Sequence, residues 1–197
     1  MSYSVVAIGT SWGGLAALTK LLGDLPADFS IPVVVVQHRS PESERLLQQL
    51  LQDATDLTVC EIEDKDELTA STVHLAPANY HTLIEDGYVS LTIDEPVRFS
   101  RPSIDVMLTS AADTYGSAAI GVVLTGANED GARGLAHVVK RGGHALVQDP
   151  KTAEIPIMPQ AALRAVPTAE VLPLDALTSR LIEFSLEHAE IGAEKMA

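Results

Sequence analysis

A serine, a histidine and an aspartate each lie within a few residues of the end of an apolar stretch of this sequence. Ser11 lies in GTSWG, which matches the G-x-S-x-G pattern of a nucleophile elbow. His38 follows IPVVVVQ, and Asp130 lies in VLTGANEDG. A serine hydroxyl needs a base to become a nucleophile, and an imidazole base needs a carboxylate to fix its tautomer. The three residues therefore predict a serine hydrolase with Ser11 as nucleophile, His38 as base and Asp130 as the orienting carboxylate.

Each of these residues also has an ordinary explanation. Gly13 and Gly14 after a strand could cradle a phosphate, although the spacing fits neither G-x-G-x-x-G nor G-x-x-x-x-G-K-[ST]. Asp130 alone could cap a helix, and Asp149 is a rival carboxylate at another strand end. Two alternatives to the enzyme stay open: a nucleotide- or phosphate-binding α/β module, and a catalytically silent docking domain whose cleft is blocked by Trp12.

The elements that must position these residues alternate between strand and helix. Residues 5–9 and 32–37 are β-branched runs typical of strands buried on both faces. Leucines at helical spacing follow the first run, and a helix is expected after Pro41. Further strands are expected near 118–126 and 144–149, with helices after each. This alternation predicts a doubly wound α/β fold, a mostly parallel sheet with helices on both faces. In such sheets the ligand site lies beyond the carboxyl ends of the strands.

The middle of the chain departs from that alternation. Residues 57–94 contain short strand-like pieces, and Asp86-Gly87 is typical of a hairpin turn. We interpret this part as a short antiparallel extension of the sheet. A helix is expected to begin at Pro102 or Ser103, with Asp105 in its first turn. Arg101, just before it, could border the cleft.

Composition narrows the possible functions. The chain has 197 residues and a formal net charge of -14, which disfavours general nucleic-acid binding. A single cysteine, Cys60, excludes an internal disulfide, and no apolar run approaches the roughly 20 residues that span a bilayer. We therefore expect a cytoplasmic protein without membrane insertion. The six histidines show no metal-site spacing, so neither a metal nor another cofactor is expected.

Five motifs, IGTSWGG, VVQH, RPSIDVML, VLTGANEDGARG and IMPQAA, resemble in order and spacing the catalytic domain of the chemotaxis-receptor methylesterases, the CheB family. The resemblance runs from about Val5 to about Phe184. It implies a doubly wound α/β fold, no cofactor, and hydrolysis of glutamyl methyl esters on the cytoplasmic methylation helices of chemotaxis receptors to glutamate and methanol. Deamidation of receptor glutamines is a related activity. The family's triad falls on Ser11, His38 and Asp130.

The sequence departs from the family pattern at three positions. Trp12 replaces a small residue after the nucleophile and could narrow the cleft for substrate. Ala127 and Asn128 replace the Met and the second Gly of LTGMGxDG. The resemblance places a backbone N–H of the oxyanion hole at Ala127, and a backbone donor survives a side-chain change. Asn128 tolerates positive φ better than other non-glycine residues, so we expect the loop to be kept.

The resemblance also predicts the domain organisation. We expect one catalytic domain over residues 1–187, a frayed tail over 188–197, and no receiver domain of the kind that many family members carry. On that expectation a phosphodonor would not change the activity, and a separate response regulator could be a partner.

Overall fold

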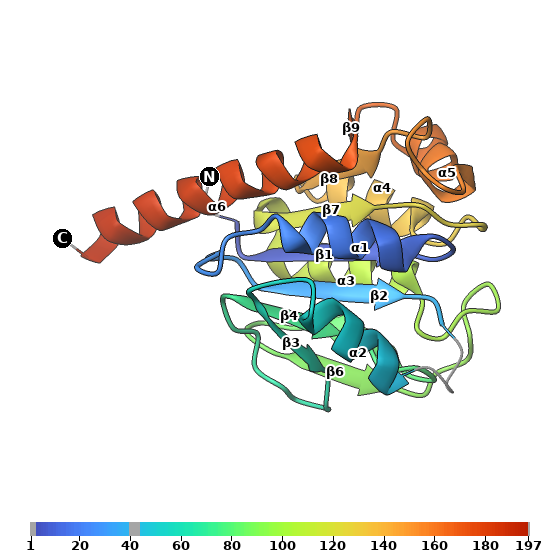
Figure 1. Cartoon of the computed structure of the whole chain (residues 1–197), viewed down its shortest axis with the longest axis horizontal. Coiled ribbons are helices and arrows are strands. Elements are labelled where there is room, and N and C mark those ends of the chain that lie inside the picture. Colours follow the sequence, from blue (N-terminus) through green and yellow to red (C-terminus); the bar gives the residue numbers. More distant parts are fainter. Residues whose placement is uncertain (1–2, 40–43, 197) are drawn as a thin grey trace.

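The computed structural model describes residues 3–39 and 44–196, and its centre is a seven-stranded sheet (Figure 1). All neighbouring strands of this sheet run parallel, in the order β3-β4-β2-β1-β7-β8-β9. The strands are β1 (Val5–Thr10), β2 (Val33–Gln37), β3 (Thr58–Glu61), β4 (Thr72–Leu75), β7 (Ala119–Val123), β8 (His144–Gln148) and β9 (Glu170–Leu172).

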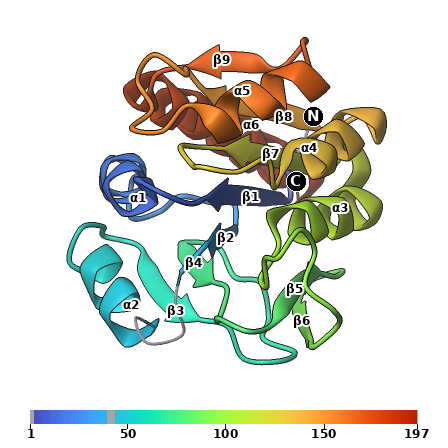
Figure 2. The same ribbon diagram turned by 90° about the vertical axis from the view of Figure 1, so that its right-hand side faces the viewer.

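Helices cover both faces of the sheet, as Figure 2 shows for α1 and α2 on one side and α3 and α4 on the other. The first face also carries α6, and the second carries α5. The bounds are α1 (Gly14–Gly23), α2 (Glu44–Gln52), α3 (Ile104–Tyr115), α4 (Ala132–Lys140), α5 (Ile157–Ala165) and α6 (Leu174–Met196), with a 3-10 turn at Gly116–Ala118.

Alternate side chains of each central strand point to opposite faces of the sheet and pack into two separate hydrophobic cores. Val6 and Ile8 of β1 pack with α1 and α6, whereas Val5 and Ala7 pack with α3 and α4. All six residues of β1 are buried. A strand that is apolar on both faces is therefore what a position at the centre of a doubly covered sheet requires.

The predicted doubly wound fold is confirmed, with one difference in the middle of the chain. The predicted hairpin consists of β5 (His81–Ile84) and β6 (Val89–Thr92), but it forms a two-stranded antiparallel sheet of its own. β3 and β4 instead join the main sheet in parallel orientation. Short strands signal pairing only weakly in sequence, so their neighbours could not be assigned in advance.

Two other expectations concern the ends of helices. The predicted helix start at Pro41 lies outside the described residues. The backbone of α6 is helical to Met196, and the division of the chain at residue 187 stays a prediction.

Across the described ranges, no helix combines the length and apolar character that crossing a membrane requires.

The strand order puts a topological switch point at β1. From β1 the chain builds one half of the sheet through β2 and β4, and later returns to the other side of β1 as β7. The loop after β1 leads to α1 on one face and the loop after β7 leads to α4 on the other, so these two loops diverge and open a crevice at the carboxyl ends of the strands, next to the loop after β2. Ser11, His38 and Asp130 all lie in these three loops.

Candidate active site

Ser11 stands in the tight turn between β1 and α1. Its N–H donates to Thr125 O at 3.0 Å, and its carbonyl accepts from Gly14 N at 2.9 Å. Gly13 follows in the left-handed region at φ 79°, where a side chain would be strained and would meet Glu154. The turn thus has the strand-to-helix geometry that the elbow motif predicts.

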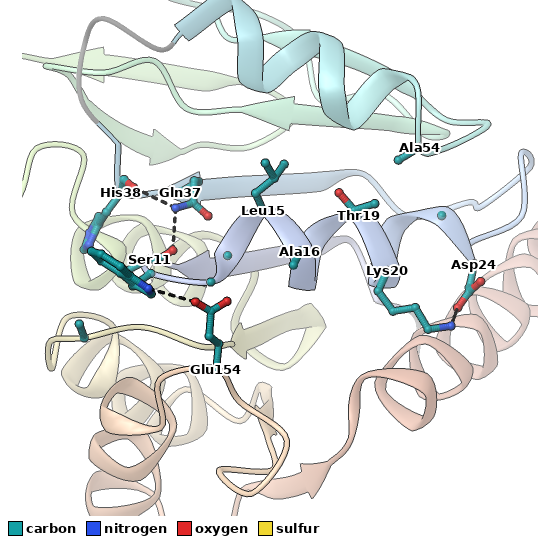
Figure 3. Close-up of a pocket in the computed structure, with 15 residues that line it drawn as sticks. Ser11, Leu15, Ala16, Thr19, Lys20, Asp24, Gln37, His38, Ala54 and Glu154 are labelled. Carbon is teal, nitrogen blue, oxygen red and sulfur yellow. Dashed lines mark hydrogen bonds and ion pairs between the residues drawn. The ribbon is translucent and has the colours of Figure 1, made fainter.

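His38 is held beside this turn by its own backbone N–H and by the side chain of the preceding residue, Gln37. The His38 N–H donates to Thr10 O at 3.1 Å, which continues the pairing of β1 with β2. The side chain of Gln37 then donates from Nε2 to Ser11 O at 2.8 Å and to His38 O at 2.9 Å (Figure 3). One buried amide therefore ties the serine turn to the histidine turn.

Asp130 lies beyond β7 and is 1% exposed. Its Oδ2 accepts from His38 Nε2 at 2.9 Å and from Ile104 N at 2.7 Å. Its Oδ1 accepts from Ser103 Oγ at 2.9 Å, Asp105 N at 3.0 Å and Gly131 N at 3.1 Å. The carboxylate thus sits at the N-terminus of α3, where free N–H groups and the helix dipole favour negative charge.

These contacts decide the charge state of Asp130. Burial raises the pKa of its carboxyl, but the hydrogen bonds from His38 and from the Asp105 and Ile104 N–H groups outweigh burial, so the pKa of Asp130 lies below its ordinary value. An ionised carboxylate accepts hydrogen bonds only. His38 therefore carries a proton on Nε2, and its Nδ1 is the nitrogen left to act as a base.

Asn128 contacts that second nitrogen. Its Nδ2 lies 3.1 Å from His38 Nδ1, and its Oδ1 accepts from Asp130 N at 3.0 Å. Asn128 is not among the described residues with positive φ. The expectation that asparagine serves here by tolerating positive φ is therefore wrong, and it is the side chain that makes the contacts.

A cavity of about 1110 Å³ runs from Ser11 along α1. Figure 3 shows Leu15, Ala16 and Thr19 of α1 along it, Gln37 and His38 on one side, and Glu154 on the other. Trp12 lines it while 66% exposed, and its Nε1 donates to Glu154 Oε1 at 3.1 Å. The indole is therefore turned across toward the loop after β8, and the cavity beside Ser11 stays open to solvent.

Two backbone donors flank the serine. The N–H groups of Trp12 and Ala127 have no hydrogen-bond partner in the part of the chain that the structure describes. Both residues line the same cavity as Ser11. N–H groups without a partner beside a nucleophile are suited to donate hydrogen bonds to an oxyanion.

The other candidate residues, Asp149 and Arg101, have hydrogen-bond partners outside the proposed triad. The Asp149 carboxylate accepts from Lys151 N at 2.9 Å in its own turn, and His38 pairs with Asp130. Arg101 donates from Nη1 to Ile93 O and Asp94 O, and lines a smaller cavity with Ser11 and His38. No group of three or more His, Cys, Asp or Glu side chains within the described ranges could hold a metal ion.

Sequence reasoning missed three contributions to the site. Ser103, expected only as a helix start, directs its hydroxyl to Asp130. Gln37 bridges two turns, and Glu154 receives the Trp12 indole. The strand-end position of Gln37 beside His38 was the one signal available, since the other two contacts join residues 27 and 142 positions apart.

Known proteins resemble this chain in sequence and in fold. The family model described as CheB methylesterase matches residues 6–181. The crystal structure of the Thermotoga maritima CheB methylesterase catalytic domain superposes with a TM-score of 0.88 at 34% identity, covering 93% of this chain and 99% of that one.

Two curated relatives differ in length. A putative protein-glutamate methylesterase/protein-glutamine glutaminase of Leptospira interrogans is 42% identical over 96% of this chain and 99% of its own length. A protein-glutamate methylesterase/protein-glutamine glutaminase 1 of Carboxydothermus hydrogenoformans is 38% identical over 90% of this chain but 54% of its own length. Because the family model matches most of the chain and these relatives exceed 30% identity, the chain belongs to the CheB methylesterase family.

Proposed function

We propose that this chain hydrolyses methyl esters on glutamyl side chains of chemotaxis receptors, giving glutamate and methanol, and that it also deamidates receptor glutamines. The names of its relatives support both activities. Receptor methylation helices lie in the cytoplasm, as the family resemblance implies, so we place the protein there too. A separate response regulator is a further partner in this proposal.

The observation that carries the proposal is the convergence of three loops. Ser11 and His38 line one cavity, and His38 Nε2 is bonded to the buried Asp130 carboxylate at 2.9 Å. The loops come from the neighbouring strands β2, β1 and β7. This arrangement supports a triad in the roles that the sequence predicts.

The proposed reaction begins with attack of Ser11 Oγ on the ester carbonyl carbon. His38 Nδ1 takes the hydroxyl proton, since Nε2 is committed to Asp130. The carbonyl oxygen becomes an oxyanion, which the N–H groups of Trp12 and Ala127 are free to bind. The carbon–methoxy bond then breaks, His38 returns the proton to the leaving oxygen, and methanol departs.

The second half of the reaction releases glutamate. A water molecule attacks the acyl-serine, and His38 Nδ1 takes one of its protons. Collapse of the second tetrahedral intermediate breaks the bond to Ser11 Oγ, which regains its proton from His38. For a glutamine side chain the same steps release ammonia instead of methanol. Asp130 stabilises the imidazolium that forms twice in each cycle.

A fluorophosphonate, which phosphonylates activated serines, tests the proposal. The adduct is located by mass spectrometry after digestion, and methanol release from methylated receptor is measured alongside. We expect one adduct, on Ser11, and loss of methanol release as the adduct forms. Absence of labelling at Ser11 would refute the triad and favour the silent docking domain.

A further inference from the structure

We propose that Asn128 is a positioning residue that restrains the enzyme: its carboxamide occupies the base nitrogen of His38 in the free protein and must turn away before Ser11 can use that nitrogen. The inference rests on the proposed function of the triad. It concerns a position where this sequence carries a side chain and the family pattern carries none.

The orientation of the Asn128 amide follows from its neighbours. Its Oδ1 lies 3.0 Å from the N–H of Asp130, which can only donate. Nδ2 is therefore the atom that points at His38 Nδ1, 3.1 Å away. Since the His38 proton is on Nε2 toward Asp130, Nδ1 holds a lone pair, and the amide donates to it.

Ser11 has no such contact. Its Oγ makes no hydrogen bond within the described part of the chain, although Ser11, His38 and Asn128 line one small cavity. The acceptor lone pair that should receive the serine proton is thus occupied by a different donor. A single in-plane lone pair accepts one well-aligned hydrogen bond, so Ser11 and Asn128 compete for it.

The competition is sharpest in the transition state. Once His38 has taken the serine proton, Nδ1 carries a hydrogen, and the Asn128 NH₂ group would face it as donor against donor. The amide must therefore leave its resting position during catalysis. Only its side chain needs to rotate, because the loop is anchored two positions further on, where the Asp130 carboxylate accepts from the N–H groups of Ile104 and Asp105 in α3.

Two substitutions separate competition from simple support of the loop. Asn128→Ala removes the donor and frees Nδ1. Asn128→Asp keeps an oxygen for the Asp130 N–H but turns a negatively charged acceptor toward His38 Nδ1, which favours the protonated imidazole. Arg39 and Arg101, the cations that line the same cavity, are unchanged in both variants. Glu129→Ala, one position further along the same loop, is the matched control.

The measurement is the rate constant of Ser11 phosphonylation by a fluorophosphonate, followed from pH 5.5 to 9, together with kcat and KM for methanol release. Loss of one hydrogen bond to the base predicts a rise of about two- to tenfold for Asn128→Ala at pH 7. The increase should appear in kcat, and KM should stay unchanged. Asn128→Asp should react more slowly than the wild type at pH 7, with its half-maximal rate moved to higher pH.

The outcomes are distinguishable from failure of the triad itself. A wild-type protein that is not labelled at Ser11 refutes the proposed function. A labelled wild type with an Asn128→Ala rate that is unchanged or lower refutes the restraint alone. Equal losses in Asn128→Ala and Asn128→Asp would likewise mean that Asn128 only supports the loop, and we expect Glu129→Ala to react at the wild-type rate.

Discussion

Replacing Asp130 by asparagine preserves the size of the side chain but removes its charge and one of its two acceptor oxygens. Asp130 accepts from two donors at Oδ2 and from three at Oδ1. With its NH₂ group at the Oδ1 position, asparagine would face the hydroxyl of Ser103 and two backbone N–H groups. The reverse orientation opposes fewer donors, so we expect the NH₂ group beside His38 and Ile104.

In that orientation the asparagine donates to His38 Nε2. The His38 proton then moves to Nδ1, and the nitrogen that faces the cleft no longer has a lone pair for the Ser11 proton. The Ile104 N–H also loses its 2.7 Å bond. The variant thus keeps its nucleophile and cavity but holds its base in the wrong tautomer.

The magnitude follows from the lost charged contacts. A hydrogen bond to a charged group contributes about 1.5–3 kcal/mol. Catalysis loses the single hydrogen bond by which Asp130 stabilises the His38 imidazolium, about 1.5–3 kcal/mol, and must also return His38 from the wrong tautomer, which costs about as much again, so the barrier rises by about 3–6 kcal/mol. At about 1.4 kcal/mol per factor of ten, kcat should fall about a hundred- to ten-thousandfold.

The assay is methanol release from methylated receptor, with the thermal midpoint of each variant recorded by circular dichroism. Asp149→Asn is the matched control, because among the described residues the Asp149 carboxylate accepts only from Lys151 N in its own turn. It should retain activity within about twofold, since it removes no contact to the site. A folded Asp130→Asn enzyme within tenfold of the wild type would refute the reasoning, as would a greater loss in Asp149→Asn.

Three further expectations follow from the structure. Ser11→Ala should keep the wild-type thermal midpoint and lose methanol release, and full activity in that variant would exclude the triad. Burial lowers the pKa of the His74 imidazole, so below the reference value of about 6.5 the unfolded chain binds a proton that the folded chain does not. Urea titrations should therefore show that the free energy of unfolding falls as the pH drops below that value. The fall should be smaller in His74→Gln. Gly14→Ala would place a methyl group 1.9 Å from Gln37 Oε1. The substitution should therefore lower the free energy of unfolding by about 1–3 kcal/mol and also reduce turnover. An unchanged urea midpoint would contradict this packing.

The members of the proposed triad could be picked out from the sequence because each lies shortly after a strongly apolar run. Such runs predict strands, and parallel strands bring their carboxyl ends to one edge. Ser11 and His38 could be assigned in this way, and the choice of Asp130 over Asp149 depended on which strand neighbours β1. The structure places β7 there and β8 one position further out.

The remaining contacts depend on side-chain directions that periodicity does not encode. Asn128 was expected to serve the backbone, but its φ is ordinary and its amide reaches His38. Ser103 begins α3 as predicted, yet its hydroxyl goes to Asp130 rather than to its own helix. The hairpin was recognised from its Asp86-Gly87 turn, but a turn does not specify which sheet its strands extend.

Because Asp130 lies at the start of α3, its carboxylate belongs to the framework of the fold as well as to the proposed triad. The backbone N–H groups of Ile104 and Asp105 donate hydrogen bonds to that carboxylate. Their exchange with solvent deuterium requires these bonds to open, so it reports on the integrity of the triad without any substrate present. Two backbone amides remote from Ser11 in the sequence can therefore act as an internal gauge of whether the active site is assembled.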